Sequence, residues 1–137
     1  MHKEKYLPLS NELLNQYHQE LESIVISKSL YLRPNLSLDD LSVETGIPIE
    51  SIKQVLDEKL NLTFFEFISD YKIGKAKRLL TKINDEHFSV LSVAVESGFN
   101  TEDSFVVLFK KYTNMSPKNY RIKYFNIDSD SNNPVKD

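Results

Sequence analysis

Apolar residues recur at spacings of three and four along most of the chain, which is the period of an amphipathic helix. The first such stretch covers residues 10–28, where Leu14, Tyr17, Leu21 and Ile24 share one face. This stretch is too short to indicate a coiled coil. We therefore expect a single amphipathic helix there.

The longest predicted helix covers residues 63–82. Thr63 and Glu66 form a capping-box pattern at its start, in which each side chain accepts a hydrogen bond from the other residue's backbone N–H. Gly74 lies inside this helix and lowers its stability by on the order of 1 kcal/mol relative to Ala. A close contact with another helix is the one reason that the sequence suggests for this glycine.

Shorter helices fill most of the remaining chain. Caps and stop signals place them at residues 37–46, 49–60, 89–98, 101–112 and from residue 116 onward. With only 3 glycines and 5 prolines, the composition favours helices over strands and turns. Residues 126–137 are rich in Asn, Asp and Ser, and we expect them to form a disordered tail.

The chain contains an internal repeat. VETG at 43–46 matches VESG at 95–98 with an offset of 52 residues, and one inserted residue then changes the offset to 53. At the second offset, NLT at 61–63 matches NMS at 114–116. The apolar residues of the two intervening helices also correspond: Ile52, Val55 and Leu56 fall on Phe105, Leu108 and Phe109.

Each repeat reads as a helix, a glycine turn, a second helix, an asparagine turn and a capped helix. Gly46 and Gly98 supply the left-handed conformation that follows a helix end, and Asn61 and Asn114 tolerate the same conformation. Two short helices joined near a glycine form the helix-turn-helix pattern. A duplicated hairpin with a purely structural role is the alternative interpretation.

The composition argues against an enzyme and against a cofactor or metal site. The 137 residues include no cysteine, and the three glycines are too far apart for a phosphate-binding or dinucleotide-binding loop. The histidines His2, His18 and His87 form no i, i+4 pair for zinc. The longest apolar run has five residues, at 105–109, whereas a membrane-spanning helix needs about 20. The start of the chain has no apolar core of a secretory signal, so a cytoplasmic location fits.

Charge is unevenly distributed along this acidic chain, whose formal net charge is −3. Residues 71–84 carry five basic and no acidic residues, and residues 104–127 carry another five basic and no acidic residues. A run of basic residues is often only a solvated helix face. Two acid-free basic stretches in an acidic chain nevertheless indicate a surface that contacts phosphates.

Several sequence motifs together resemble the AraC/XylS type of transcription regulator. In the second repeat these are SGFNTEDSF at 97–105, FKKYTNMSP at 109–117 and YR at 120–121. Upstream matches are SLDDL at 37–41, GI at 46–47, YKI at 71–73 and AKRLL at 76–80. The resemblance covers about residues 31–124, and the motifs of both repeats occur in order.

The resemblance implies an all-α fold of seven helices in two helix-turn-helix lobes joined by a long linker helix, here 63–82. Residues 31–125 would form this domain, and residues 1–30 would add an N-terminal extension helix before it. Members of the family bind double-stranded DNA and activate or repress transcription. The second helix of each lobe, about 49–60 and 101–112, would be a recognition helix.

The resemblance and the helix register together nominate DNA-contacting residues. The base-reading candidates are Ser51, Lys53, Gln54, Thr101, Ser104 and Val107, because hydroxyl, amide and amino groups read base edges and a valine can touch a thymine methyl. The phosphate-contact candidates are Lys72, Lys110, Lys111 and Lys118. We expect no catalytic residue, no metal, no cofactor and no small-molecule site.

An alternative function is a protein-interaction module that keeps the fold but reads DNA weakly. The buried face defined by Phe105, Leu108 and Phe109 should leave Val106 and Val107 exposed, an unusual pair for a phosphate-lined groove. Acidic side chains also occur near the expected groove surface, although acids at helix starts favour the helix dipole too. They are Glu50, Asp57, Glu102 and Asp103.

The resemblance also implies partners beyond double-stranded DNA. About 30 residues before the domain cannot hold an effector-binding barrel, so the chain is expected to be the DNA-binding part of a larger regulator or a small stand-alone member. The first segment resembles the one that precedes this domain in regulators with a separate, often membrane-attached sensor. An upstream sensor region, RNA polymerase and a second copy of the chain are the further candidate partners.

Overall fold

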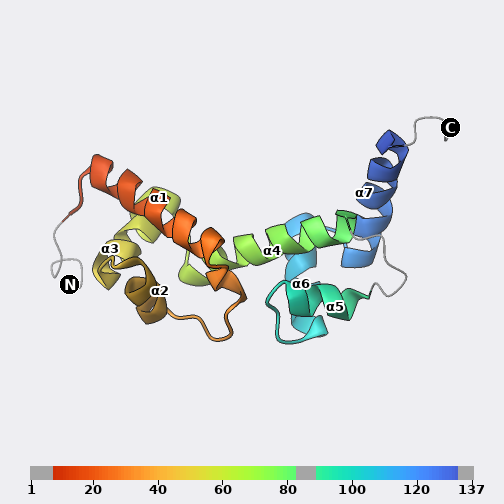
Figure 1. Ribbon diagram of the computed structural model, residues 1–137, viewed down its shortest axis with the longest axis horizontal. Coiled ribbons are helices and arrows are strands. Elements are labelled where there is room, and N and C mark those ends of the chain that lie inside the picture. Colours follow the sequence, from red (N-terminus) through yellow and green to blue (C-terminus); the bar gives the residue numbers. More distant parts are fainter. Residues whose placement is uncertain (1–7, 83–88, 133–137) are drawn as a thin grey trace. The chain divides into compact units, whose positions relative to one another are not determined.

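The computed structural model describes residues 8–82 and 89–132, and this part of the chain is helical with no strand (Figure 1). The all-α class with seven helices is confirmed. The helices are α1 (Asn11–Ser27), α2 (Leu38–Thr45), α3 (Ile49–Gln54), α4 (Phe64–Lys82), α5 (Val90–Glu96), α6 (Glu102–Thr113) and α7 (Pro117–Asn132). A 3₁₀ turn, η2 (Leu30–Leu32), follows α1, and a π-helical segment, η3 (Val55–Leu60), continues α3.

The chain folds as two compact units, Met1–Ser69 and Asp70–Asp137, and α4 continues from the first into the second. Unit 1 holds α1, α2 and α3, and unit 2 holds α5, α6 and α7. Each unit therefore contains one of the two sequence repeats.

The first helix, which the sequence analysis treats as an extension before the domain, is one of the seven helices in the described part of the chain. α1 is itself one of the seven and contacts α2, α3 and η3 within unit 1. Its residues Leu14, Leu21 and Val25 are buried. Burying this apolar stripe against the other helices of the unit removes it from water, which is favourable. α1 is therefore part of that unit's core.

The glycine and asparagine turns of both repeats have the left-handed backbone conformation that the sequence predicts. Gly46 has a φ of 77° and Gly98 a φ of 92°. Asn61 and Asn114 have φ values of 55° and 62°. The repeat seen in the sequence is therefore a repeat of backbone geometry.

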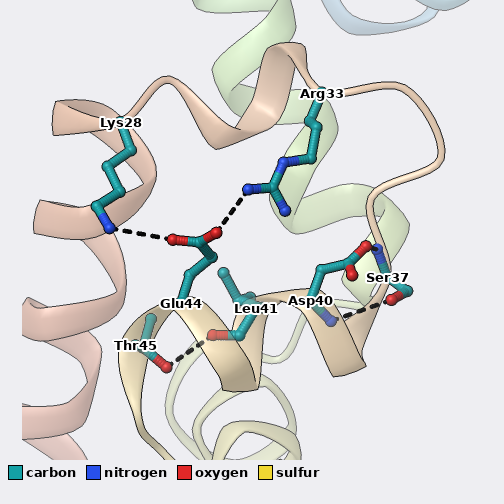
Figure 2. Close-up of polar contacts among 7 residues, drawn as sticks. All are labelled: Lys28, Arg33, Ser37, Asp40, Leu41, Glu44 and Thr45. Atoms are coloured by element: carbon teal, nitrogen blue, oxygen red, sulfur yellow. Dashed lines mark hydrogen bonds and ion pairs between the residues drawn. The ribbon is translucent and has the colours of Figure 1, made fainter.

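Matching caps start the corresponding helices of the two units. Ser37 and Asp40 form a capping box at α2, and Ser89 and Ser92 form the equivalent box at α5 (the first is drawn in Figure 2). At α4 the predicted capping box is present as well: the Thr63 N–H donates to Glu66 Oε1 at 2.9 Å, and the Glu66 N–H donates to Thr63 Oγ1 at 3.0 Å. Satisfying the free N–H groups of a helix start in this way fixes where each helix begins.

Unit 2 is built around the aromatic residues of α6. Phe105 and Phe109 are fully buried and pack against Ile73, Ala76 and Leu80 of α4. Their ring centroids lie 5.5 Å apart in an edge-on arrangement. This contact holds α6 against α4, and so determines which face of α6 points outward.

The last helix, α7, is attached to the unit 2 core by two contacts. The Tyr120 ring lies edge-on to Phe109 at 5.2 Å, and burial, with a smaller effect of Tyr124, raises the pKa of Tyr120. Arg121 Nη1 donates to the carbonyl oxygen of Leu80 at 2.8 Å, and burial lowers the pKa of Arg121. α7 continues to Asn132, so residues 126–132, which were expected to be disordered, are helical; residues 133–137 lie outside the described residues.

A carboxylate joins three segments of unit 1. Glu44 of α2 binds Lys28 Nζ at 3.1 Å and Arg33 Nη2 at 2.6 Å, which connects the end of α1 and the chain after η2 to α2 (Figure 2). The guanidinium of Arg33, followed by the ammonium of Lys28, lowers the pKa of Glu44. Two of the basic residues of unit 1 are thereby already paired with an acid.

Replacing Gly74 by Ala should stabilise the protein by about 1 kcal/mol, because alanine is the better helix former. Among the described residues, the one neighbour within 4 Å of a Cβ built at Gly74 is the Arg78 side chain, at 3.7 Å. The described part of the chain therefore shows no close helix contact at Gly74. Urea unfolding of Gly74→Ala and the parent chain measures the difference.

Gly46→Ala is the matched control. It makes the same chemical change at a residue with a φ of 77°, where alanine is strained, so it should destabilise the protein by about 1–2 kcal/mol. A destabilised Gly74→Ala would show that α4 needs flexibility at this point.

Glu44→Gln should lower the thermal midpoint at neutral pH, and the difference from the parent should disappear in acid. Because the pKa of Glu44 is lowered in the folded state, its stabilising contribution is present above its ordinary pKa of 4.5. That contribution is lost as the pH falls through the pKa that Glu44 has in the folded protein, because the protonated carboxyl is then neutral like the glutamine amide of the variant. Thermal melts of both proteins from neutral pH to below pH 4.5 test this.

Glu96→Gln provides the control for the second unit. Glu96 is the exposed counterpart of Glu44 at the 52-residue offset, and within the described residues it forms no ion pair. Its substitution should therefore leave the pH dependence of the thermal midpoint unchanged. An equal effect of both substitutions would mean that the Glu44 ion pairs contribute nothing specific.

Candidate nucleic-acid interface

The outward face of α6 follows from its buried face. Phe105 and Phe109 are fully buried, and at about 100° per residue Val107 lies about 160° from each of them. Val107 is accordingly 69% exposed. Ser104 and Lys111 stand three and four residues from Val107, and both are exposed, so the three side chains share one outward face.

Val106 does not belong to this face, contrary to the expectation from the sequence. It is half-buried and packs against the unit 2 core. The reason is its angle on the helix, since Val106 lies only about 60° from Phe109. α6 therefore exposes one valine rather than an adjacent pair.

Two of the proposed base-reading residues also cap α6. Thr101 Oγ1 accepts from the Ser104 N–H at 3.0 Å and donates to Ser104 Oγ at 2.9 Å. Ser104 Oγ in turn donates to the Thr101 carbonyl oxygen at 3.0 Å. Both residues are exposed, so they can meet a ligand, but their hydroxyl groups must exchange these local bonds to do so.

Three of the four proposed phosphate contacts are exposed lysines. Lys110 and Lys111 lie in the last turn of α6, and Lys118 is the second residue of α7. Among the described residues none of the three forms an ion pair. Their ammonium groups are therefore available to an external anion.

Lys72, the fourth phosphate candidate, is differently placed. Its Nζ lies 5.5 Å from the centroid of the Phe99 ring, in a cation–π contact between α4 and the turn that follows α5. Partial burial lowers the pKa of Lys72. To contact a phosphate, the Lys72 ammonium would have to move off the Phe99 ring, or the phosphate would have to approach the ammonium on the side that faces away from the ring.

Two of the base-reading candidates in unit 1 are buried, which corrects the expectation for Ser51 and Gln54. Ser51 is 9% and Gln54 3% exposed. α1 contacts α3 and η3, and the Leu9 N–H, just before α1, donates to Gln54 Oε1 at 3.0 Å. Both side chains are therefore covered by the rest of the protein, and Lys53 alone of the three is exposed.

The acidic residues noted near the expected groove surface are all exposed: Glu50, Asp57, Glu102 and Asp103. Glu102 and Asp103 occupy the first turn of α6, where they favour the helix dipole. Asp57 lies in the later part of the second helix of unit 1, where the dipole gives no such benefit.

Two exposed basic residues of α4, Lys77 and Arg78, are not among the phosphate-contact candidates proposed from the sequence. The signal that could have found them was the acid-free stretch at 71–84.

The described residues contain no group of three His, Asp or Glu side chains arranged to hold a metal ion. Within the same residues, no helix has the length and apolar character needed to cross a membrane.

Two helix pairs, α2 with α3 and α5 with α6, each have a left-handed glycine between their helices, at Gly46 and Gly98, and together define a double helix-turn-helix protein. A family model described as a helix-turn-helix domain matches residues 27–123. The crystal structure of a Chromobacterium violaceum regulator described as having an AraC-type DNA-binding domain has a TM-score of 0.65 at 16% identity. That match covers 80% of this chain and 96% of the other. The chain belongs to this AraC-type family of DNA-binding domains of transcription regulators.

Two further proteins are similar to this chain. The DNA-binding domain of AdpA, a global transcriptional factor solved in complex with a target DNA, has a TM-score of 0.63 at 18% identity, over 84% of this chain and 96% of that one. An uncharacterized HTH-type transcriptional regulator of Staphylococcus aureus (strain COL) is 28% identical over 130 residues. The match covers 88% of this chain but 16% of the relative, so the chain spans about a sixth of that protein's length.

Proposed function

We propose that the chain binds double-stranded DNA sequence-specifically and that α6 enters the major groove. The observation that carries this proposal is the outward face of α6, where Ser104 and Val107 are exposed and Lys110 and Lys111 follow. An α-helix fits the major groove, and lysines at its end can hold it against the phosphates. The solved complex of AdpA with DNA supports the same type of partner for this fold.

The side chains of α6 have different roles in this proposal. Thr101 and Ser104 hydrogen-bond to base edges, and Val107 touches a thymine methyl. Lys110, Lys111 and Lys118 bind phosphates and set the register of the helix. Lys72 contributes a phosphate contact if its ammonium exchanges the Phe99 ring for the DNA.

The repeated scaffold supports a second contact through α3, with Lys53 as its base-reading residue. Two recognition helices on one face of a duplex read segments about 10–10.5 base pairs apart, one helical turn. Substitution of Lys53 and of Ser104 should then relax the specificity at different base pairs.

In the whole protein we propose that this chain acts as the DNA-binding part of a longer, cytoplasmic transcription regulator. The small share of the S. aureus relative that it covers supports an attached region, such as a sensor. RNA polymerase and a second copy of the chain are further proposed partners.

A protein-interaction module remains the second candidate function. The observation that favours it is the 69% exposure of Val107, an apolar side chain in the middle of the proposed groove-facing surface. A protein partner would bury this valine and gain hydrophobic free energy.

DNA binding should be strongly salt-dependent although the chain is acidic overall. Each phosphate neutralised by a lysine releases counterions, so the log–log plot of affinity against salt should be linear with a slope of about −0.9 per phosphate. Lys110→Ala should make that slope shallower by about 1. Fluorescence anisotropy with a labelled duplex over a series of KCl concentrations measures the slope.

Lys28→Ala is the charge-matched control, because Lys28 is already paired with Glu44. It removes the same charge and should leave the slope nearly unchanged. A flat salt response of the parent chain would contradict the DNA-binding proposal.

Val107→Arg should raise non-specific affinity for duplex DNA, because it adds a cation at the centre of the groove-facing surface. Val95→Arg adds the same charge at a 60% exposed valine of α5 and should have a smaller effect. Titration of both variants and the parent with one duplex gives the comparison. No detectable binding by any of the three at low salt would favour the protein-interaction function.

A further inference from the structure

We infer that the two units bind DNA unequally: unit 2 supplies most of the electrostatic affinity, and an acidic pair in unit 1 weakens its contact with the phosphates. This inference rests on the proposed DNA binding and concerns how the binding is divided. The pair in unit 1 is Asp57 and Glu58, and its counterpart in unit 2 is Lys110 and Lys111.

The two pairs occupy equivalent positions of the repeat. At the 53-residue offset Ile52 and Leu56 correspond to Phe105 and Phe109, and all four side chains are buried. The residues directly after Leu56 and Phe109 therefore leave the buried face at the same point of each second helix. All four residues of the two pairs are exposed.

The charges at these equivalent positions are opposite. If both second helices approach DNA in the same way, the lysine pair attracts phosphates where the acidic pair repels them. Helix stability accounts for only one of the pairs: cations near a helix C-terminus interact favourably with the dipole, whereas anions do not. Asp57 and Glu58 thus repel phosphates without stabilising the second helix of unit 1 through its dipole.

The total charge of each unit points the same way. Unit 1, residues 1–69, carries 6 basic and 11 acidic residues, a net charge of −5. Unit 2, residues 70–137, carries 11 basic and 9 acidic residues, a net charge of +2. In unit 1, Lys28 and Arg33 are also paired with Glu44, which leaves Lys53 and Lys59 as the other basic residues of its described part.

The reading positions differ between the units as well. Ser51 and Gln54 correspond to Ser104 and Val107 at the 53-residue offset. The unit 1 residues are covered where α1 and the Leu9 N–H approach α3, whereas the unit 2 residues are exposed. Unit 1 therefore offers fewer side chains to bases and a less favourable potential to phosphates.

Paired variants of the full chain test the inference. The probe is a labelled mixed-sequence duplex of about 30 base pairs, long enough for two segments one turn apart. Lys110→Ala with Lys111→Ala removes two charges from unit 2, and Lys53→Ala with Lys59→Ala removes two from unit 1, so the variants have equal net charge. We expect the unit 2 variant to lose affinity by at least about tenfold at low salt and its salt slope to become shallower by about 2, against less than 1 for the unit 1 variant.

A gain-of-charge variant provides a second, independent readout. Asp57→Lys with Glu58→Lys gives unit 1 the lysine pair of unit 2 and should increase the affinity and steepen the salt slope. Far-ultraviolet circular dichroism and thermal melts check that each variant is folded. Because this variant is expected to bind more tightly than the parent, a folding defect cannot imitate the expected result.

The outcomes separate the inference from the proposed function. If the parent does not bind the duplex at low salt, the proposed function itself fails. If the parent binds, the inference is overturned when the unit 1 lysine variant loses as much affinity as the unit 2 variant. It is also overturned when the folded Asp57→Lys, Glu58→Lys variant binds no better than the parent.

Discussion

Burial of one face of the second helix in each unit is the constraint on which the rest of the structure depends. In unit 2 the fully buried Phe105 and Phe109 hold α6 against α4 and leave Val107 pointing away from the core. Because a helix is rigid, fixing two side chains one turn apart fixes the direction of every other side chain on it. The surface available to a ligand is thus a consequence of core packing.

The two units show how one scaffold can present different surfaces. Their caps and left-handed turns correspond, yet Gln54 is buried where its counterpart Val107 is exposed. The Leu9 N–H, in the segment that leads into α1, donates to Gln54 Oε1, and α1 itself contacts α3 and η3. A duplicated fold therefore does not imply a duplicated binding surface, which agrees with the general separation of fold from function.

Much of the fold could be predicted because its signals are local. A capping box needs residues three positions apart, and a left-handed turn needs one glycine or asparagine. Periodicity located the buried face of α6, but it did not show how wide that face is, and Val106 was wrongly expected to be exposed. The width depends on how closely the neighbouring helices of unit 2 approach α6, and no residue pattern within α6 contains that information.

The sequence by itself determined where the helices start, where all of them except α7 stop, the repeat, and the basic stretches that include Lys110 and Lys111. Only the tertiary structure decided which candidate side chains remain accessible. Ser51 and Gln54 satisfy every local criterion for a reading position, but they are covered within unit 1. The physical reason is that exposure results from contacts between segments far apart in the chain, such as the 45 residues that separate Leu9 from Gln54.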